Sequence, residues 1–461
     1  MPQRIRELCT LALLGLLPFH ALGVTVLTRI VDGPNQPPMG ALALWKEGIL
    51  ALVLLLACVE FVTTKRDQRP EARRKIFSWD VLDVCIIVLA ASLLFSTFLV
   101  SGLRSPAFVY GIRYDLVPLA AFVVLRRVDW SEWFRVRAPF VLAIAACIAA
   151  VYALITLALP ASFFTAIGYS DLHSLYIPGR PIAAFQQIGG STLRRLQGPM
   201  SGPNQFGIWL AAVLPFALTL RPQLRRIIAP LLLLAIVLSF SRAAWIATAV
   251  ALVIALWPQL KKLSVTAVTT LCIGVLAIAV TVLFAFPSVI LRVESSIDHL
   301  RNPLEAARIM LREPLGRGLG SAGPANNRVA DACVYQEEGS DASWAVPHAD
   351  LCVFVGEAQV QPIGRSCTCP LLPENWYLQL GVEGGWLAFI TFIALVFLAL
   401  KKLRTVRSPV FLSLLVVSIA ALFLHAWEDA AVAYAVWTMI AVTLPPSTAG
   451  RTGRTSGPGI S

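Results

Sequence analysis

Long apolar runs separated by short polar stretches extend over most of the chain, and this pattern predicts a polytopic helical membrane protein. Apolar runs of about 20 residues recur, and a helix of that length spans the roughly 30 Å hydrocarbon core of a bilayer. Backbone polar groups inside a bilayer must be satisfied within the segment, which favours helices. Twelve helices are predicted, at residues 8–28, 40–62, 79–100, 110–126, 138–159, 204–220, 226–241, 242–258, 264–290, 375–400, 409–426 and 428–445.

One long polar stretch, residues 291–374, interrupts this pattern and divides the chain. The predicted organisation is a membrane domain of nine helices over 1–290, a long loop with interfacial helices over 291–374, and three further membrane helices over 375–445. The last segment, 446–461, is rich in Gly, Ser, Thr and Pro, a composition typical of a disordered tail. No repeat of fixed period is evident. We therefore expect an all-α polytopic fold with about 12 spans.

Composition supports the membrane assignment and excludes a soluble protein of this length. The chain is 57% hydrophobic and only 14% charged, whereas soluble domains carry about 25% charged residues. The formal net charge of +12 would suit a nucleic-acid-binding protein, but the basic residues fall in short clusters between apolar runs. Such clusters orient helices in a membrane, so membrane lipids are expected as partners and nucleic acid is not.

The orientation in the membrane depends on how the sequence is read at Ser241-Arg242. If these residues form a turn between two helices, more than half of the 38 lysines and arginines fall in short loops on one side. If they lie inside one long helix, the cluster Lys401-Lys402 moves to the opposite side. Because short cytoplasmic loops carry the excess of positive charge, we predict twelve helices with both termini cytoplasmic and the 291–374 loop outside. The apolar run after Arg4-Ile5-Arg6 is interpreted as an uncleaved first helix.

Four of the nine cysteines fall in the predicted outer loop, at Cys333, Cys352, Cys367 and Cys369. An even number of cysteines in an oxidising compartment predicts two disulfides, with three pairings open. A zinc site is the alternative, but Cys367-x-Cys369 has the wrong gap for a zinc knuckle. His348 is the one histidine near these cysteines in the sequence, and we expect no metal.

Arginines on the predicted outer face are candidates for an anion-binding site: Arg113, Arg194, Arg195 and Arg242. A guanidinium group matches phosphate oxygens two at a time, and contact with lipid headgroups is the alternative role. Arg242 favours a phosphate or pyrophosphate site, because it lies in a very short turn and must face a protein-lined polar space. Gly202-Pro203-Asn204 would place helix N-terminal amides near an anion or form a plain helix cap.

General-base candidates on the same face are His348 and Glu374, with Glu383, Glu428 and Asp429 as further acids. A base must lie near an acceptor hydroxyl and be partly desolvated. Glu374 immediately precedes the return into the membrane, where complementing the helix dipole is its alternative role. His348 lies in polar loop sequence, where a solvated histidine is the alternative. Lys46-Glu47, inside the second predicted helix, is interpreted as an internal ion pair or a functional pair.

Four short motifs flank the predicted outer face: Leu196-Gln197-Gly198 through Pro203-Asn204, Ser239 to Trp245, Arg308 to Ser321, and Glu374-Asn375-Trp376-Tyr377-Leu378-Gln379 through Glu383-Gly384-Gly385. The segment from Ala306 to Ser321, which contains the third motif, predicts a short interfacial helix ended by Pro314 and followed by a glycine-rich turn. Their order and placement over residues 40–440 resemble the O-antigen ligase/polymerase-like family of membrane glycosyltransferases. The chain departs from the family at Ala243, where glycine is usual, and at Glu374, where ligases usually carry histidine.

This resemblance implies a GT-C-like helical fold in the bacterial inner membrane, with an active face on the periplasmic side. It implies an inverting, metal-independent and cofactor-independent transfer from an undecaprenyl-diphosphate-linked glycan to a lipid, protein or glycan acceptor. Arg195 and Arg242 would bind pyrophosphate, with Arg113, Arg194 and Arg317 in support, and Glu374 or His348 would be the base. The supporting residues would be Asn204, Ser241, Asn375, Tyr377 and Glu383.

A transporter or flippase of lipid-linked glycans is the alternative function. Twelve helices with cytoplasmic ends suit such a protein. Transporters, however, place their polar binding residues near the bilayer midplane and commonly contain internal repeats. In this chain the polar residues gather at one face.

Overall fold

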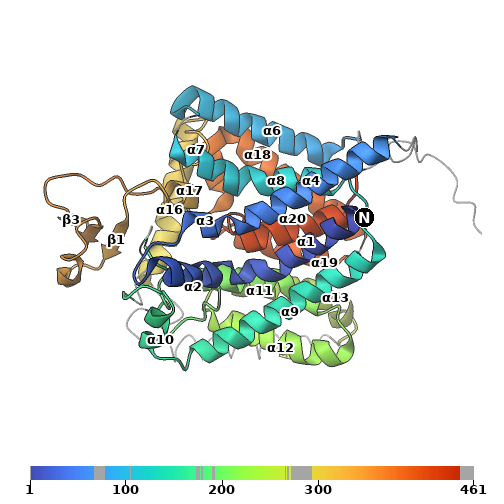
Figure 1. The fold of residues 1–461 in the computed structure, drawn as a ribbon, viewed down its shortest axis with the longest axis horizontal. Coiled ribbons are helices and arrows are strands. Elements are labelled where there is room, and N and C mark those ends of the chain that lie inside the picture. The colour runs from blue at the N-terminus through green and yellow to red at the C-terminus, as the bar shows by residue number, and fades with distance from the viewer. Residues whose placement is uncertain are drawn as a thin grey trace, which may run out of the picture.

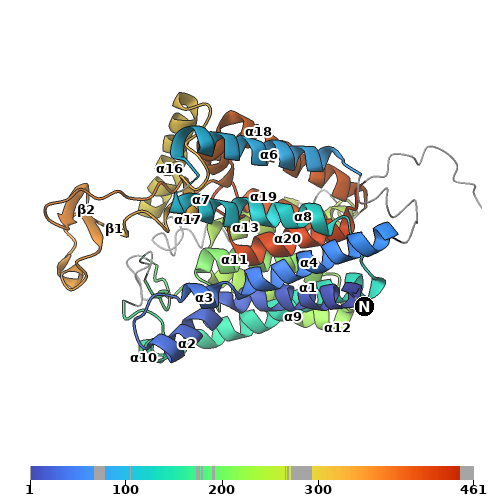
Figure 2. The same ribbon diagram turned by 45° about the horizontal axis from the view of Figure 1, so that its top comes forward.

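The protein is a bundle of helices with a small β-sheet arm projecting from one end, as a computed structural model shows (Figure 1). The structure describes residues 2–66, 78–103, 105–172, 177, 180–188, 193–264, 266, 269–270, 293–406 and 408–446. The N-terminus lies at the end of the bundle opposite the arm (Figures 1 and 2).

The first half of the bundle contains α1 (Pro2–Leu16), α2 (His20–Asp32), α3 (Gly40–Ala43), α4 (Trp45–Arg66), α6 (Val81–Ser96), α7 (Pro106–Gly111), α8 (Val117–Leu125), α9 (Glu132–Thr156) and α10 (Ala161–Ala166). The second half contains α11 (Pro203–Ala217), α12 (Pro222–Leu238), α13 (Arg242–Leu260), α16 (Val293–Arg312), α17 (Gly323–Asn326), α18 (Trp376–Thr405), α19 (Pro409–Ala420) and α20 (Ala430–Thr443). A short 3₁₀ helix (Leu17–Phe19) joins α1 to α2. Short π-helical turns extend α6 (Thr97–Ser101) and join α7 to α8 (Ile112–Leu116).

Six of the described helical segments are long and apolar enough to cross a membrane: Pro2–Asp32, Val81–Val100, Pro106–Leu125, Glu132–Thr156, Arg242–Leu260 and Trp376–Thr405. The helices α19 and α20 are apolar but shorter. Helices occur at eleven of the twelve predicted positions. The predicted helix 264–290 lies almost wholly outside the described residues, as does the predicted tail beyond residue 446. The chain is therefore a helical protein of membrane-embedded character, and the count of twelve spans stays a prediction.

The break predicted at Ser241-Arg242 is confirmed. Helix α12 ends at Leu238 and α13 begins at Arg242. Between them Phe240 has φ +50°, in the left-handed region that a bulky side chain rarely enters. The chain therefore reverses sharply there instead of continuing as one long helix.

Ion pairs draw the predicted cytoplasmic segments together at one end of the bundle. Arg6 pairs with Glu60 at 2.9 Å. Asp80, which precedes α6, accepts from Arg126 at 2.8 Å and from Lys402 at 2.6 Å. These contacts join α1 to α4, and the start of α6 to the ends of α8 and α18. The basic segments that the charge pattern places on one side of the membrane thus lie at one end of the bundle. That this side is cytoplasmic stays a prediction.

Helix α11 lies in the centre of the second half of the bundle. Every side chain from Phe206 to Ala217 is buried, and α11 packs on α9, α12, α13 and α19. Gly207 permits a close approach to the turn between α12 and α13, because an added Cβ would meet Ser239 Oγ at 2.6 Å. This contact sets the start of α11 beside Ser241.

The arm contains the three-stranded sheet β1 (Cys333–Gln336), β2 (Cys352–Val355) and β3 (Ala358–Gln361). β1 pairs parallel to β2, and β2 pairs antiparallel to β3. Disulfides Cys333–Cys369 and Cys352–Cys367 tie the strands to the chain that returns to the membrane. Such cross-links stabilise a segment too small to bury a core of its own.

Candidate functional site

Arg195 holds together the elements at the arm end of the second half of the bundle. Its guanidinium donates to Ser239 O at 3.1 Å, to Asn204 Oδ1 at 2.7 Å and to Gln186 Oε1 at 3.0 Å. Arg195 is only 8% exposed. Most of its five N–H donors are thus used to fix the start of α11 against the α12–α13 turn. The contacts are those of a positioning residue, and direct binding of pyrophosphate by Arg195 stays a prediction.

Arg242 and Glu374 are brought together at the same end. Arg242 is the first residue of α13, directly after Ser241, the residue that precedes the helix. Glu374 comes just before α18 and lies close enough to Arg242 to interact with it electrostatically. Glu374 has φ +50°, a conformation uncommon for a non-glycine residue. The structure therefore brings the predicted base near the predicted pyrophosphate arginine, although their motifs lie far apart in the chain.

Residues after Glu374 anchor the entry into α18. The side chain of Asn375 caps the helix by accepting from Leu378 N at 3.0 Å, and its amide donates to Leu422 O at 2.9 Å. The Tyr377 hydroxyl donates to Ser418 O at 2.9 Å. Asn375 and Tyr377 thus bind α18 to α19 and fix the position of Glu374.

The glycine-rich turn after α16 encloses Glu383, which is fully buried within α18. Glu383 Oε1 accepts from Gly320 N at 3.1 Å and from Ala322 N at 3.4 Å, and Gly318 N donates to the Glu383 carbonyl at 2.9 Å. Gly320 has φ +79°, and a Cβ there would meet Ala107 O at 2.1 Å. Only glycine fits at this position of the turn.

Two further buried acids, Asp115 and Glu428, join Glu383. Asp115 lies close enough to both glutamates for their carboxyl groups to interact, although the three come from different parts of the chain. Carboxylates are acceptors only, so a bond between two carboxyl groups requires a shared proton. The trio Asp115, Glu383 and Glu428 therefore forms a buried carboxyl cluster that can hold protons.

A polar chain extends from this carboxyl cluster along α18. The amide of Gln379 donates to Glu428 Oε1 at 2.6 Å, and its oxygen lies 2.5 Å from His425 Nδ1. Sequence reasoning missed the cluster, although it had singled out Glu383 and Glu428 separately. The apolar surroundings of Asp115 in its predicted helix were the available signal, since an acid inside a membrane helix marks a functional candidate.

Arg113 lies in a second polar group. Its Nε donates to Glu47 Oε1 at 2.6 Å, and Lys46 Nζ lies 3.3 Å from the same oxygen. The predicted internal pair Lys46-Glu47 is thus present, with Arg113 as a third member. A small cavity is lined by these three side chains together with Tyr114 and Glu428, so this group borders the carboxyl cluster.

Three other predicted site residues have their own contacts elsewhere. Arg194 donates to Leu159 O at 2.7 Å. Arg317 pairs with Glu313 at 2.7 Å, and its hydrogen bonds lower the pKa of Glu313. His348 lies in the arm, with its ring 6.4 Å from that of Trp344. The predicted arginine set is therefore divided among several places, and the pair Arg242–Glu374 is its best-assembled part.

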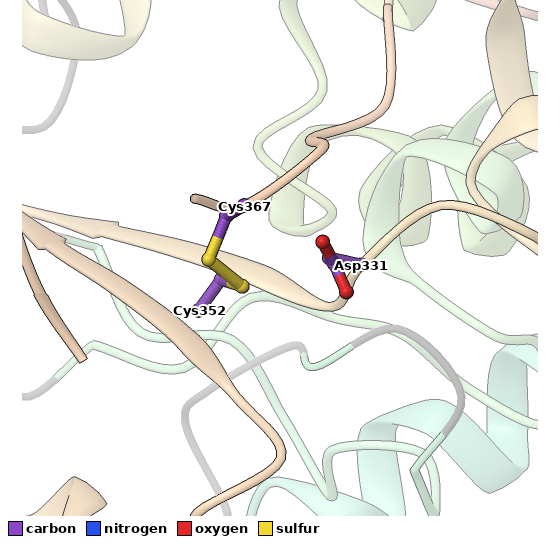
Figure 3. A group of neighbouring side chains, drawn as sticks. All are labelled: Asp331, Cys352 and Cys367. Carbon is purple, nitrogen blue, oxygen red and sulfur yellow. A yellow bond between two sulfur atoms is a disulfide. The ribbon is translucent and has the colours of Figure 1, made fainter. Parts of the chain in front are cut away.

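Asp331, Cys352 and Cys367 lie together in the arm (Figure 3). Both sulfurs belong to one disulfide, so neither offers the thiolate that binds a metal. The Asp331 carboxylate accepts from Arg365 and from Thr368 N at 2.7 Å. These contacts indicate that Asp331, Cys352 and Cys367 stabilise the arm.

Comparison with known proteins adds no family assignment to this geometry. No protein-family model matches the chain, and no curated protein matches it.

Proposed function

We propose that this chain is a glycosyltransferase of the O-antigen ligase/polymerase-like kind, acting at the periplasmic face of the bacterial inner membrane. It would transfer a glycan from an undecaprenyl-diphosphate carrier to an acceptor hydroxyl. The observation that supports this most is the proximity of Arg242 and Glu374. Both residues belong to motifs that resemble the family, and they lie at the end of the bundle away from the basic segments.

The proposed chemistry is a single displacement at the anomeric carbon. The acceptor oxygen forms the new glycosidic bond while the bond to the donor phosphate breaks with inversion. Glu374 takes the acceptor proton, a role that contributes about 10²–10⁴-fold. Arg242 stabilises the charge that develops on the departing pyrophosphate. Arg195 fixes the positions of Ser239 and Asn204 by hydrogen bonds, and so supports the turn that carries Arg242.

The test is transfer from purified undecaprenyl-diphosphate glycan in proteoliposomes. Arg242→Ala and Glu374→Gln should each lower the rate by about 10²-fold or more. Matched controls are Arg137→Ala, at an exposed position beside Trp133 near the start of α9, and Glu357→Gln, at an exposed position in the arm. Unchanged transfer by Arg242→Ala and Glu374→Gln would reject this site.

The buried carboxyl cluster gives specific support to a second function, the transport of lipid-linked glycans. Chains of acids and histidine serve as proton relays in transporters. Asp115 and Glu383 connect through Glu428 and Gln379 to His425, and Glu428 and His425 lie in the connection between α19 and α20. Movement of a labelled lipid-linked glycan between leaflets without a new glycosidic bond would favour this function. Product formation without movement would favour the transferase.

A further inference from the structure

Helix α16 is placed differently from the other long helices. It runs across one end of the bundle, at the base of the arm, and not alongside the spanning helices (Figures 1 and 2). Its inner face packs on α18, where Ala306 and Met310 are buried. It ends at Arg312, just before Pro314, as the sequence predicts, but it begins earlier than residue 306.

The outward face of α16 carries a ridge of exposed leucines. Leu300 is 66% exposed, Leu304 51% and Leu311 66%. Their spacings of four and seven residues place them on one side of a helix. Leu315, 56% exposed directly after the helix, extends the ridge. Exposed leucines in such a row are unexpected on a surface that faces only water.

A second ridge, of arginines, lies beside the first. Arg301, Arg308 and Arg312 are exposed, and their spacings of seven and four residues place them on one adjacent strip of the helix. Among the residues that the structure describes, none of the three forms an ion pair. Because they are exposed, these guanidinium groups can contact an anionic partner.

An apolar ridge next to a cationic ridge, on a helix that crosses the ends of spanning helices, is the arrangement of an interfacial helix. We propose that α16 lies in the headgroup layer of the membrane on the arm side and binds anionic phospholipids. The leucines enter the acyl region, and Arg301, Arg308 and Arg312 bind the lipid phosphates. A leucine ridge at the level of the helix ends suits lipid, and the exposed arginines select lipids whose headgroups carry net negative charge.

This surface connects directly to the buried carboxyl cluster. The chain leaves α16 into the turn whose Gly320 and Ala322 amides bind Glu383. Trp386 N, beyond the kink of α18 at Gly385, donates to Pro314 O at 3.1 Å. Binding of α16 to lipid would therefore restrict the movement of the turn whose amides bind Glu383. The lipid site itself does not depend on the proposed glycosyl transfer.

The test uses the full chain with a photoreactive benzophenone amino acid at Leu304 or Leu311. The protein is reconstituted in nanodiscs with equal amounts of phosphatidylglycerol and phosphatidylethanolamine, and the adducts are identified by mass spectrometry. Both positions should give lipid adducts, enriched in phosphatidylglycerol by about fivefold or more. The same group at Ile363, which is 97% exposed in the arm, should give none.

The arginines are tested by replacing Arg301, Arg308 and Arg312 with glutamine together. The enrichment should then fall to about one while the lipid adducts persist, because the leucines still enter the bilayer. Arg137→Gln is the matched control and should keep the enrichment. Adducts to a second copy or another protein, or equal labelling of the two lipids in the unaltered chain, would overturn the proposal.

Discussion

The two ends of the bundle bury charge in opposite ways. At the end that carries the N-terminus, Arg126 and Asp83 are buried as partners at 3.3 Å, and Arg127 lies 2.9 Å from the same carboxylate. At the end that carries the arm, Asp115 lies against Glu383 and Glu428, acid against acid. A buried ion pair is compensated internally, whereas neighbouring buried acids favour the protonated form of one of them. The first arrangement suits a structural role, whereas buried acids placed against one another, which cost stability, are typical of functional sites.

Breaking the paired end should have the largest effect. Arg126→Ala removes one of the two basic partners of Asp80, leaving Lys402, and leaves Asp83 with Arg127 alone. Removing one member of a buried pair costs about 3–5 kcal/mol. Denaturant unfolding of the purified protein in detergent should show this loss. Arg137→Ala, at an exposed arginine, should stay within about 0.5 kcal/mol of the parent, and an equal loss in the two variants would contradict the structural role of Arg126.

Loosening the turn over the carboxyl cluster should have the next largest effect. Gly320→Ala adds a Cβ against Ala107 O at a positive φ, which should cost about 2–4 kcal/mol and free Glu383 from its two amide donors. The matched control is Gly339→Ala, where φ is +84° and no atom lies within 4 Å of the added Cβ. It carries only the backbone strain, about 1–2 kcal/mol. Equal losses in the two variants would show that the contact with Ala107 is not tight.

Relieving the acid cluster should have a smaller effect of opposite sign. Asp115→Asn removes one carboxyl and supplies an amide that can donate to Glu383 or Glu428. Stability should rise by about 1 kcal/mol, as often happens when strain at a functional site is removed, while the movement of lipid-linked glycan expected of the second function falls. Thermal unfolding and glycan-movement assays on the same preparation would show both. A loss of stability as large as that of Arg126→Ala would mean that the acid cluster is structural after all.

Patterns local in sequence predicted much of the bundle. The apolar runs located α6, α9 and α18, and the distribution of lysines and arginines among the short loops located the break between α12 and α13, because one long helix there would move Lys401-Lys402 to the opposite side. Four outer cysteines indicated two disulfides, but their pairing needed the fold. The strands β1 to β3 were not predicted, because runs of four residues carry little periodicity.

The candidate site was only partly accessible to sequence reasoning. Arg242 and Glu374 lie in separate motifs, and motif order alone brought them to the same face. Arg113 and Arg317 were predicted to support the same pyrophosphate site. In the structure Arg113 pairs with Glu47 and Arg317 pairs with Glu313, and these partners determine the direction of each side chain. The contact between Asp115, in the Ile112–Leu116 turn before α8, and Glu383, in α18, joins residues far apart in the chain, which no local pattern encodes.

The smallest expected effect concerns the arm, where charge pairing lies at the surface. Hydrogen bonds from Arg365 and from the Thr368 amide hold the pKa of Asp331 below its ordinary value. A carboxyl with a lowered folded-state pKa stabilises the fold above its unfolded pKa of about 4, and that contribution is lost as the pH falls further. Exposed pairs contribute little, so the change should be local. Hydrogen-exchange protection of the Thr368 amide, corrected for intrinsic rates, should fall several-fold between pH 5 and pH 3. In Asp331→Asn it should be low at both values, whereas Asp341→Asn, in the same arm, should behave like the parent. Protection that falls equally in Asp331→Asn would assign the pH response to another carboxyl.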